Sequence, residues 1–324
     1  MQGLLLLLCD YPYKASNRRL FQELLKEVND WDYLVKIINS HGIIALAAYN
    51  ISESGLTKEI PPKATAALNA GLMKNIARNA WLKERWKEVN EILTGAGINY
   101  VLLKGMALEH TIYESKGLRQ MTDLDILTDE GSAEKAAQLL VSNGYRPEPL
   151  KSALFRKIHN HVGKHYPTFH KDGFMIDLHV RLSGKPFRKE DIITGTDQIS
   201  IDGFNALVLK RDIHLQYLTD HFRLHETGGD CQMRLYRDIL LLDPSSNINF
   251  PKEFLEEPKQ SHKRQYRKAQ YKSAIKMIPS KYRLRYLAGD IFPSIEWMKK
   301  RYGCTVAGAI IRYPVRLFKL ARLL

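Results

Sequence analysis

Two carboxylates stand two residues apart in a short apolar run, Asp123-Leu124-Asp125-Ile126-Leu127. If this run forms a strand, its side chains alternate between two faces, so Asp123 and Asp125 share one face. Two like charges held side by side are costly unless a cation lies between them. The pair therefore predicts a divalent metal site at the end of a strand.

A third carboxylate follows in a second β-rich stretch, from His165 to Leu182. There Asp172-Gly173 separates two β-rich runs and is typical of a hairpin turn. On the second arm, Asp177 and His179 alternate with apolar residues, so both fall on its polar face. Asp177 is the natural third metal ligand; the alternative is a salt bridge to Arg119 or Arg181. His179 is either a partner of the acids or an ordinary strand residue.

A candidate phosphate-binding turn precedes the acid pair. Lys104-Gly105 closes the apolar run at 98–103 and leads into a predicted helix at 106–113. Gly105 would let the backbone approach a ligand, the helix N-terminus offers free N–H groups, and Lys104 adds positive charge. Arg119 has two interpretations, either capping a loop or binding phosphate oxygens through two parallel hydrogen bonds.

The predicted elements around these residues alternate between helix and strand in the middle of the chain and are helical at both ends. Helical spacing of apolar residues covers the first 95 or so residues, including a long amphipathic helix at 64–93, and returns at 208–242 and 252–324. Between them the order is strand 98–103, helix 106–113, strand 123–127, helix 132–141 and a hairpin within 165–182. This order predicts an α+β fold with a small mixed sheet.

The positive charge is concentrated at the C-terminal end. The net charge is +14, and residues 259–324 hold 17 Lys and Arg against Asp290 and Glu296 alone. Three interpretations stay open: a solvated helical face packed on the body, which we place first, an anionic membrane surface, or nucleic acid. Arginine and lysine interleaved with apolar residues at 310–324 favour a membrane surface over base recognition, so nucleic acid is the weakest of the three.

Cysteine usage and the first residues indicate the compartment. Cys9, Cys231 and Cys304 are far apart and form no metal-binding pattern, so we expect reduced thiols in a cytoplasmic protein, with a peripheral position at the inner membrane surface as the extension. The apolar run Leu4–Leu8 has no basic segment before it and is too short to span a bilayer. It predicts a buried first helix.

The ordered set of motifs resembles the DNA polymerase β-type nucleotidyltransferase superfamily. More closely, it is similar to the bacterial family usually labelled uncharacterised nucleotidyltransferase, over roughly residues 30 to 250. In the superfamily a Gly-Ser pair usually precedes the acids; here Lys104-Gly105 does, without the hydroxyl. The matching segments are Leu102-Leu103-Lys104-Gly105, Tyr113, Arg119, Asp123–Leu127, Gly144-Tyr145 and Ile176–His179, with weaker matches at Trp31, His41-Gly42 and Leu235–Asp238.

The resemblance implies an organisation and an activity. It implies a helical region at 1–95, a nucleotidyltransferase core at 96–205 and a C-terminal helical region with a basic tail at 206–324. It also implies transfer of a nucleoside monophosphate from an NTP such as ATP, with Mg²⁺ held by Asp123, Asp125 and Asp177. Two Mg²⁺ ions are expected, with Mn²⁺ as an alternative, and the acceptor is a hydroxyl of a small molecule, glycan, peptide or protein. The alternative is a non-catalytic member that binds nucleotide or a partner.

Overall fold

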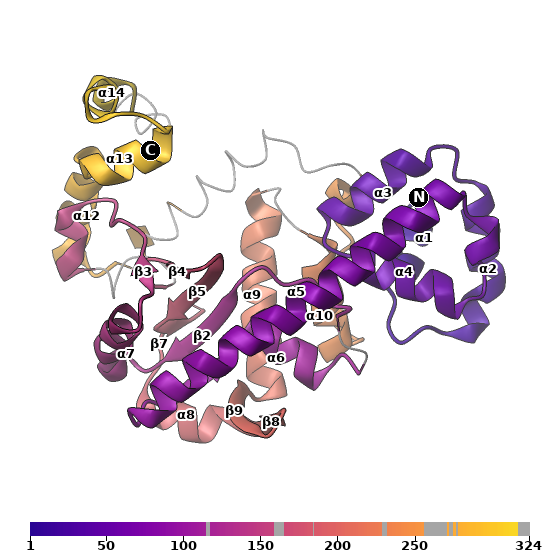
Figure 1. The fold of residues 1–324 in the computed structure, drawn as a ribbon, viewed down its shortest axis with the longest axis horizontal. Coiled ribbons are helices and arrows are strands. Elements are labelled where there is room, and N and C mark those ends of the chain that lie inside the picture. The colour runs from indigo at the N-terminus through magenta and orange to yellow at the C-terminus, as the bar shows by residue number, and fades with distance from the viewer. Residues whose placement is uncertain are drawn as a thin grey trace.

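The computed structural model describes residues 1–114, 117–158, 165–183, 185–228, 232–255, 271, 275–276 and 278–316. A seven-stranded mixed sheet lies at the centre of the molecule (Figure 1), with the strand order β3-β4-β5-β2-β1-β9-β8. β1 pairs antiparallel with β2 and parallel with β9, and β2 pairs parallel with β5. The sheet strands are β1 (Tyr100–Leu102), β2 (Leu124–Thr128), β3 (Arg146–Pro147), β4 (Phe169–Lys171), β5 (Phe174–His179), β8 (Thr196–Ile201) and β9 (Phe204–Leu209). The expected mixed sheet with helices is confirmed.

Helices occupy both ends of the chain, as the sequence predicted. The helices before β1 are α1 (Gln2–Leu8), α2 (Arg18–Lys26), α3 (Trp31–Ser40), α4 (Ile44–Glu53) and α5 (Pro62–Gly95). Those between and after the strands are α6 (Lys104–Thr111), α7 (Glu130–Ser142), α8 (Lys189–Gly195), α9 (Arg211–Gly228), α10 (Met233–Leu242), α12 (Ser280–Ile291), α13 (Ile295–Tyr302) and α14 (Val306–Ile311). Short 3₁₀ helices lie at Ala15–Asn17, Thr57–Glu59, Ala153–Lys157 and Lys252–Leu255, and β6 (Arg181–Leu182) pairs with β7 (Lys185–Pro186). No helix among the described residues is long and apolar enough to cross a bilayer.

The first helix is buried, as expected from its apolar run. Leu4, Leu5 and Leu8 of α1 are almost completely shielded from solvent. They belong to an apolar cluster that also contains residues of α3, α4, α9 and α10. Helices from the two halves of the sequence therefore share one core, because each buries its apolar stripe against the others.

The central strands are covered on both faces. Leu102 and Ile126 pack in a cluster with Leu82 and Trp86 of α5. Val101 and Leu127, which point the other way, belong to the cluster that contains α9. Side chains alternate along a strand, so neighbouring residues of β2 face opposite sides of the sheet. Ile126 faces α5, and Asp125 therefore faces α9.

Two hairpins border the sheet, and the sequence predicted one of them. The turn Asp172-Gly173 has positive φ at both residues, 50° and 80°, and joins β4 to β5. The turn Asp202-Gly203 has φ values of 50° and 86° and joins β8 to β9 in the same way. The prediction that the helical pattern resumes at Val208 is wrong, because Val208 pairs with Leu102 inside β9.

Candidate active site

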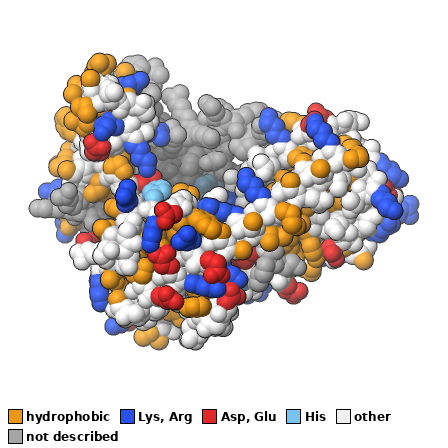
Figure 2. All heavy atoms as spheres, viewed as in Figure 1, with side chains coloured by type: hydrophobic (Ala, Val, Ile, Leu, Met, Phe, Trp, Pro, Cys, Tyr) orange, Lys and Arg blue, Asp and Glu red, His pale blue; other side chains and the backbone are white. Residues whose placement is uncertain are grey.

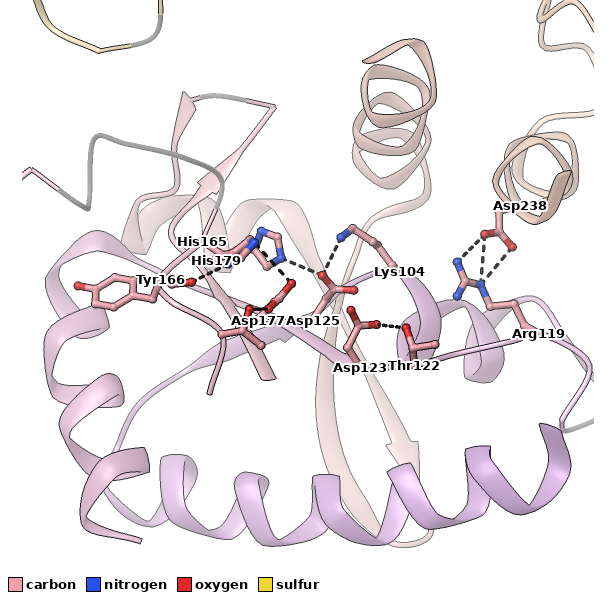
Figure 3. Close-up of polar contacts among 11 residues, drawn as sticks. Lys104, Arg119, Thr122, Asp123, Asp125, His165, Tyr166, Asp177, His179 and Asp238 are labelled. Carbon is pink, nitrogen blue, oxygen red and sulfur yellow. Dashed lines mark hydrogen bonds and ion pairs between the residues drawn. The ribbon is translucent and has the colours of Figure 1, made fainter. Parts of the chain in front are cut away.

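Parallel pairing of β2 with β5 brings two of the predicted acids together. Asp125 lies opposite Asp177 in the register, and Leu127 lies opposite His179. A carboxylate oxygen of each acid and a ring nitrogen of His179 all lie within 4.8 Å of one another. The hairpin therefore delivers Asp177 and His179 to the same face of the sheet as Asp125 (Figure 3).

Asp125 is the most buried of the three acids and is held from two sides. Its Oδ1 accepts a hydrogen bond from Lys104 Nζ at 2.6 Å and lies 2.9 Å from His179 Nε2 (Figure 3). Burial disfavours its charge, but Lys104 and His179 outweigh burial and hold the pKa of Asp125 well below its ordinary value. Burial lowers the pKa of His179 to about 4 against the pull of Asp125, so at neutral pH a neutral imidazole donates from Nε2. Asp125 is therefore ionised and fixed in orientation.

Asp123 lies one residue before β2 and is only half-buried. Thr122 Oγ1 donates to its Oδ1 at 3.1 Å. Burial, followed by repulsion from the Asp125 carboxylate, raises the pKa of Asp123. A cation bound among these oxygens would relieve that repulsion, and two or three carboxylates are a donor set that Mg²⁺ accepts. The residues present therefore fit a Mg²⁺ site, with His179 orienting Asp125 from behind.

Asp177 has its own pair of supporting side chains. Thr168 Oγ1 donates to Asp177 Oδ1 at 2.7 Å, and His165 Nε2 lies 3.5 Å from Asp177 Oδ2. Sequence reasoning considered a bond from Asp177 to Arg119 or Arg181, but Arg181 pairs with Glu130. A cavity of about 200 Å³ adjoins this side of the acids and is lined by Glu148, Pro149, Leu150, Lys151, Phe155, His165, Tyr166, Pro167 and Thr168.

The turn at the start of α6 directs Lys104 towards the acids and Gly105 away from them. Lys104 has a φ of 43°, and its side chain reaches Asp125. Burial opposes its charge, but attraction to Asp125 raises the pKa of Lys104 above its ordinary value. A Cβ added at Gly105 would lie 2.7 Å from Met121 Cγ and 3.0 Å from Arg119 NH1, so the glycine allows close packing there.

Arg119 pairs with Asp238 and with none of the three predicted acids drawn beside it (Figure 3). Its NH2 lies 2.7 Å from Asp238 Oδ2 on α10, and both side chains are buried. Tyr113 Oη also donates to Asp238, at 3.1 Å, and Asn79 Nδ2 of α5 donates to the Arg119 carbonyl at 2.9 Å. Arg119 thus anchors the loop that leads into Asp123, and its charge is already matched.

A cavity of about 260 Å³ opens beside Asp123 and Asp125. It is lined by Lys104, Arg119, Thr122, Asp123, Asp125, His221, His225, Gln232, Arg234 and Leu235, of which only the leucine is apolar. Sequence reasoning assigned no role here to Arg234. The available signals were the i,i+4 spacing of the two histidines and the position of Arg234 directly before Leu235-Tyr236-Arg237-Asp238.

We compared the chain with protein families, solved structures and curated proteins. A family described as uncharacterised nucleotidyltransferase matches residues 27–260, which include every residue of the site described here. A crystal structure from Thermotoga maritima, of a protein named provisionally as a nucleotidyltransferase, matches with a TM-score of 0.34 and 15% identity. That match covers 44% of this chain and 86% of the other. A search of curated proteins gave no match.

Proposed function

Because the chain belongs to the uncharacterised nucleotidyltransferase family, we propose that it transfers a nucleoside monophosphate from an NTP to a hydroxyl group, with Mg²⁺. The observation that carries the proposal is the side-by-side placement of Asp125 and Asp177, with a polar cavity next to Asp125. Carboxylates in this arrangement suit divalent metal ions that offset the charge of a reacting phosphate.

Asp123, Asp125 and Asp177 would hold the metal ions. Bound Mg²⁺ supplies charge stabilisation at the α-phosphate and at the leaving pyrophosphate. His179 keeps Asp125 ionised and correctly turned, and Lys104 adds positive charge at the edge of the cavity that it lines. The chain's own contribution is to position the reactants and match their charge.

The acceptor hydroxyl approaches from the Asp177 side. Its oxygen attacks the α-phosphorus, the bond from that phosphorus to the bridging oxygen breaks, and pyrophosphate leaves. The hydroxyl proton passes to the Asp177 carboxylate, which Thr168 holds in place. A cavity on this side is lined by His165 and Thr168, the two residues that contact Asp177, and would be the approach for the acceptor.

The test follows label and pyrophosphate together. Each of the four NTPs, labelled at the α-phosphate, is incubated with Mg²⁺ and with small-molecule, glycan, peptide and protein acceptors. We expect label transfer with one pyrophosphate released per transfer, and a fall of at least about a hundredfold in Asp125→Asn and Asp177→Asn. Asp243→Asn, in the loop after α10, is the control and keeps full activity. Nucleotide binding without any transfer or pyrophosphate release would instead establish the non-catalytic alternative.

The C-terminal helices favour a second, separate role at an anionic membrane surface. Ile310 and Ile311 are 56% and 74% exposed, and apolar side chains gather over α13 and α14 (Figure 2). Apolar side chains exposed on a basic segment suit the interface of a bilayer with anionic headgroups. Of the predicted basic stripe, Arg316 instead contacts the protein, lying 4.6 Å from the Trp297 ring, and residues 317–324 lie outside the described structure.

A further inference from the structure

Arg234 is a partly buried arginine that forms no ion pair with any acid among the residues that the structure describes. Its NH1 donates to the Gln120 carbonyl oxygen at 3.0 Å. Its Nε is fully shielded from solvent and has no hydrogen-bond partner among the residues that the structure describes, and no acid there lies within ion-pair distance. Nearby arginines differ: Arg119 pairs with Asp238, and Arg237 pairs with Asp10 at 2.7 Å. Shielding part of a guanidinium from water without a counter-ion has a cost, which a ligand that supplies negative charge would offset.

The cavity next to Arg234 leaves this charge available for an anion. Lys104 and Arg119 also line the cavity, but Lys104 is bound to Asp125 and Arg119 to Asp238. Of the three described arginine and lysine residues in the lining, Arg234 is therefore the one without an acidic partner among the described residues. Among the described residues of the lining, Leu235 is the one apolar side chain, and none is Phe, Tyr or Trp. It suits phosphate groups rather than a nucleobase, which needs aromatic or apolar faces to stack on.

The backbone around residue 42 fixes where this guanidinium lies. Arg234 N donates to the His41 carbonyl oxygen at 3.2 Å. Gly42 has a φ of 72°, and a Cβ added there would lie 2.8 Å from Arg234 Cδ. The absence of a side chain at Gly42 therefore lets the arginine stem pass close to the turn between α3 and α4. Through this contact, the N-terminal helices help to position a residue that lines the cavity.

We propose that Arg234 binds the polyphosphate chain of the nucleotide and that Gly42 is its positioning residue. The identity of the ligand as an NTP rests on the function proposed above, whereas binding of the anion itself does not require turnover. The planar guanidinium can donate two parallel hydrogen bonds to phosphate oxygens, which a lysine cannot.

The test measures binding of tripolyphosphate to the full chain by titration calorimetry without metal. Replacing Arg234 with Gln is expected to weaken binding at least about tenfold, as loss of hydrogen bonds to a charged group does. Arg234→Lys restores part of the affinity. Arg211→Gln is the matched control and binds like the wild type, because Arg211 also donates to backbone carbonyls, those of Leu241 and Leu242, but does not line the cavity.

Thermal unfolding separates a ligand-binding arginine from a structural one. Without ligand, Arg234→Gln is expected to unfold at the same temperature as the wild type or higher, because an unmatched charge is removed. Tripolyphosphate should then raise Tm less in this variant than in the wild type. A lowered Tm together with unchanged tripolyphosphate affinity would show a structural role and overturn the proposal.

Two further outcomes separate this inference from the proposed transfer reaction. If the wild type binds tripolyphosphate through Arg234 but transfers no nucleotide, the Arg234 site stands and the proposed function fails. If the wild type does not bind tripolyphosphate at millimolar concentration, the Arg234 site is overturned whatever the turnover. Gly42→Ala is expected to weaken tripolyphosphate binding severalfold with Arg234 intact, and unchanged affinity would remove Gly42 from the proposal.

Discussion

Replacing Lys104 with methionine removes the charge that offsets Asp125 while keeping most of the side-chain volume. Lys104 Nζ lies 2.6 Å from Asp125 Oδ1, and Asp125 is 6% exposed. Without the ammonium, Asp125 stays next to Asp123 and Asp177 with His179 as its remaining donor. The folded state then holds a crowded, buried negative charge.

The cost follows from the burial of the pair. Breaking a buried ion pair from one side destabilises a protein by about 3–5 kcal/mol. Because His179 still donates to Asp125, we expect the lower end, about 3 kcal/mol, which lowers Tm by several degrees. Mg²⁺ should bind the variant more tightly, since no ammonium competes for Asp125. A tenfold gain in affinity would return about 1.4 kcal/mol when the ion is in excess.

The assay is thermal and denaturant unfolding without Mg²⁺ and with Mg²⁺ in large excess over its Kd, so that a difference in affinity appears in full as a difference in stabilisation. Lys104→Met should be less stable than the wild type without metal and should gain more from Mg²⁺. Lys83→Met is the matched control, because Lys83 pairs with the more exposed Asp202 on the surface. It should cost under about 1 kcal/mol and show no added Mg²⁺ effect. Equal stability of Lys104→Met and wild type without metal would refute the role of Lys104 as the counter-charge.

Three other predictions concern the anchor, the pH response and the exposed C-terminal surface. Asp238→Asn leaves Arg119 buried without a counter-ion and should lower the free energy of unfolding in denaturant by about 3 kcal/mol. Glu23→Gln, which breaks an exposed pair, is the control and should lower it by under about 0.5 kcal/mol. Equal losses in the two variants would contradict this prediction. Burial lowers the pKa of His214 from 6.5 to about 4, so the unfolded chain takes up a proton that the folded chain refuses, and stability falls as pH drops through 6.5 towards 4. Between pH 7.5 and 5 the wild type should lose about 2 kcal/mol more than His214→Phe, and parallel losses would exclude His214 as the cause. Ile311→Asp should reduce sedimentation with anionic vesicles at least about tenfold, while neutral vesicles should bind neither protein; anionic binding that survives the change would exclude this surface.

The sequence determined the parts of the site that depend on neighbouring residues. Alternation along a strand placed Asp177 and His179 on one face, and the Asp172-Gly173 turn predicted the hairpin that carries them. The second Asp-Gly turn, at residues 202–203, carries an equal local signal, but the hairpin of β8 and β9 was not among the predictions. These features were readable because a period of two and a turn with positive φ are local properties of the chain.

The partners of the charged residues were decided by tertiary structure. Arg119 was expected to cap a loop or hold phosphate, but it pairs with Asp238, which is 119 positions later in the sequence. Lys104 was expected to contact phosphate, and in the structure its ammonium contacts Asp125. A buried charge takes whichever opposite charge the packed helices bring within reach, and sequence spacing carries no information about that.

Arg234 and Gly42 are the furthest from prediction. No motif around either residue indicates that the two are in contact. They meet because α10 packs beside the turn between α3 and α4, where Arg234 N donates to the His41 carbonyl oxygen. The sequence by itself supplied the acids and their strand faces, since these follow from local periodicity. Only the folded chain decided which cations are already matched and which one is left for a ligand, since that depends on contacts between distant segments.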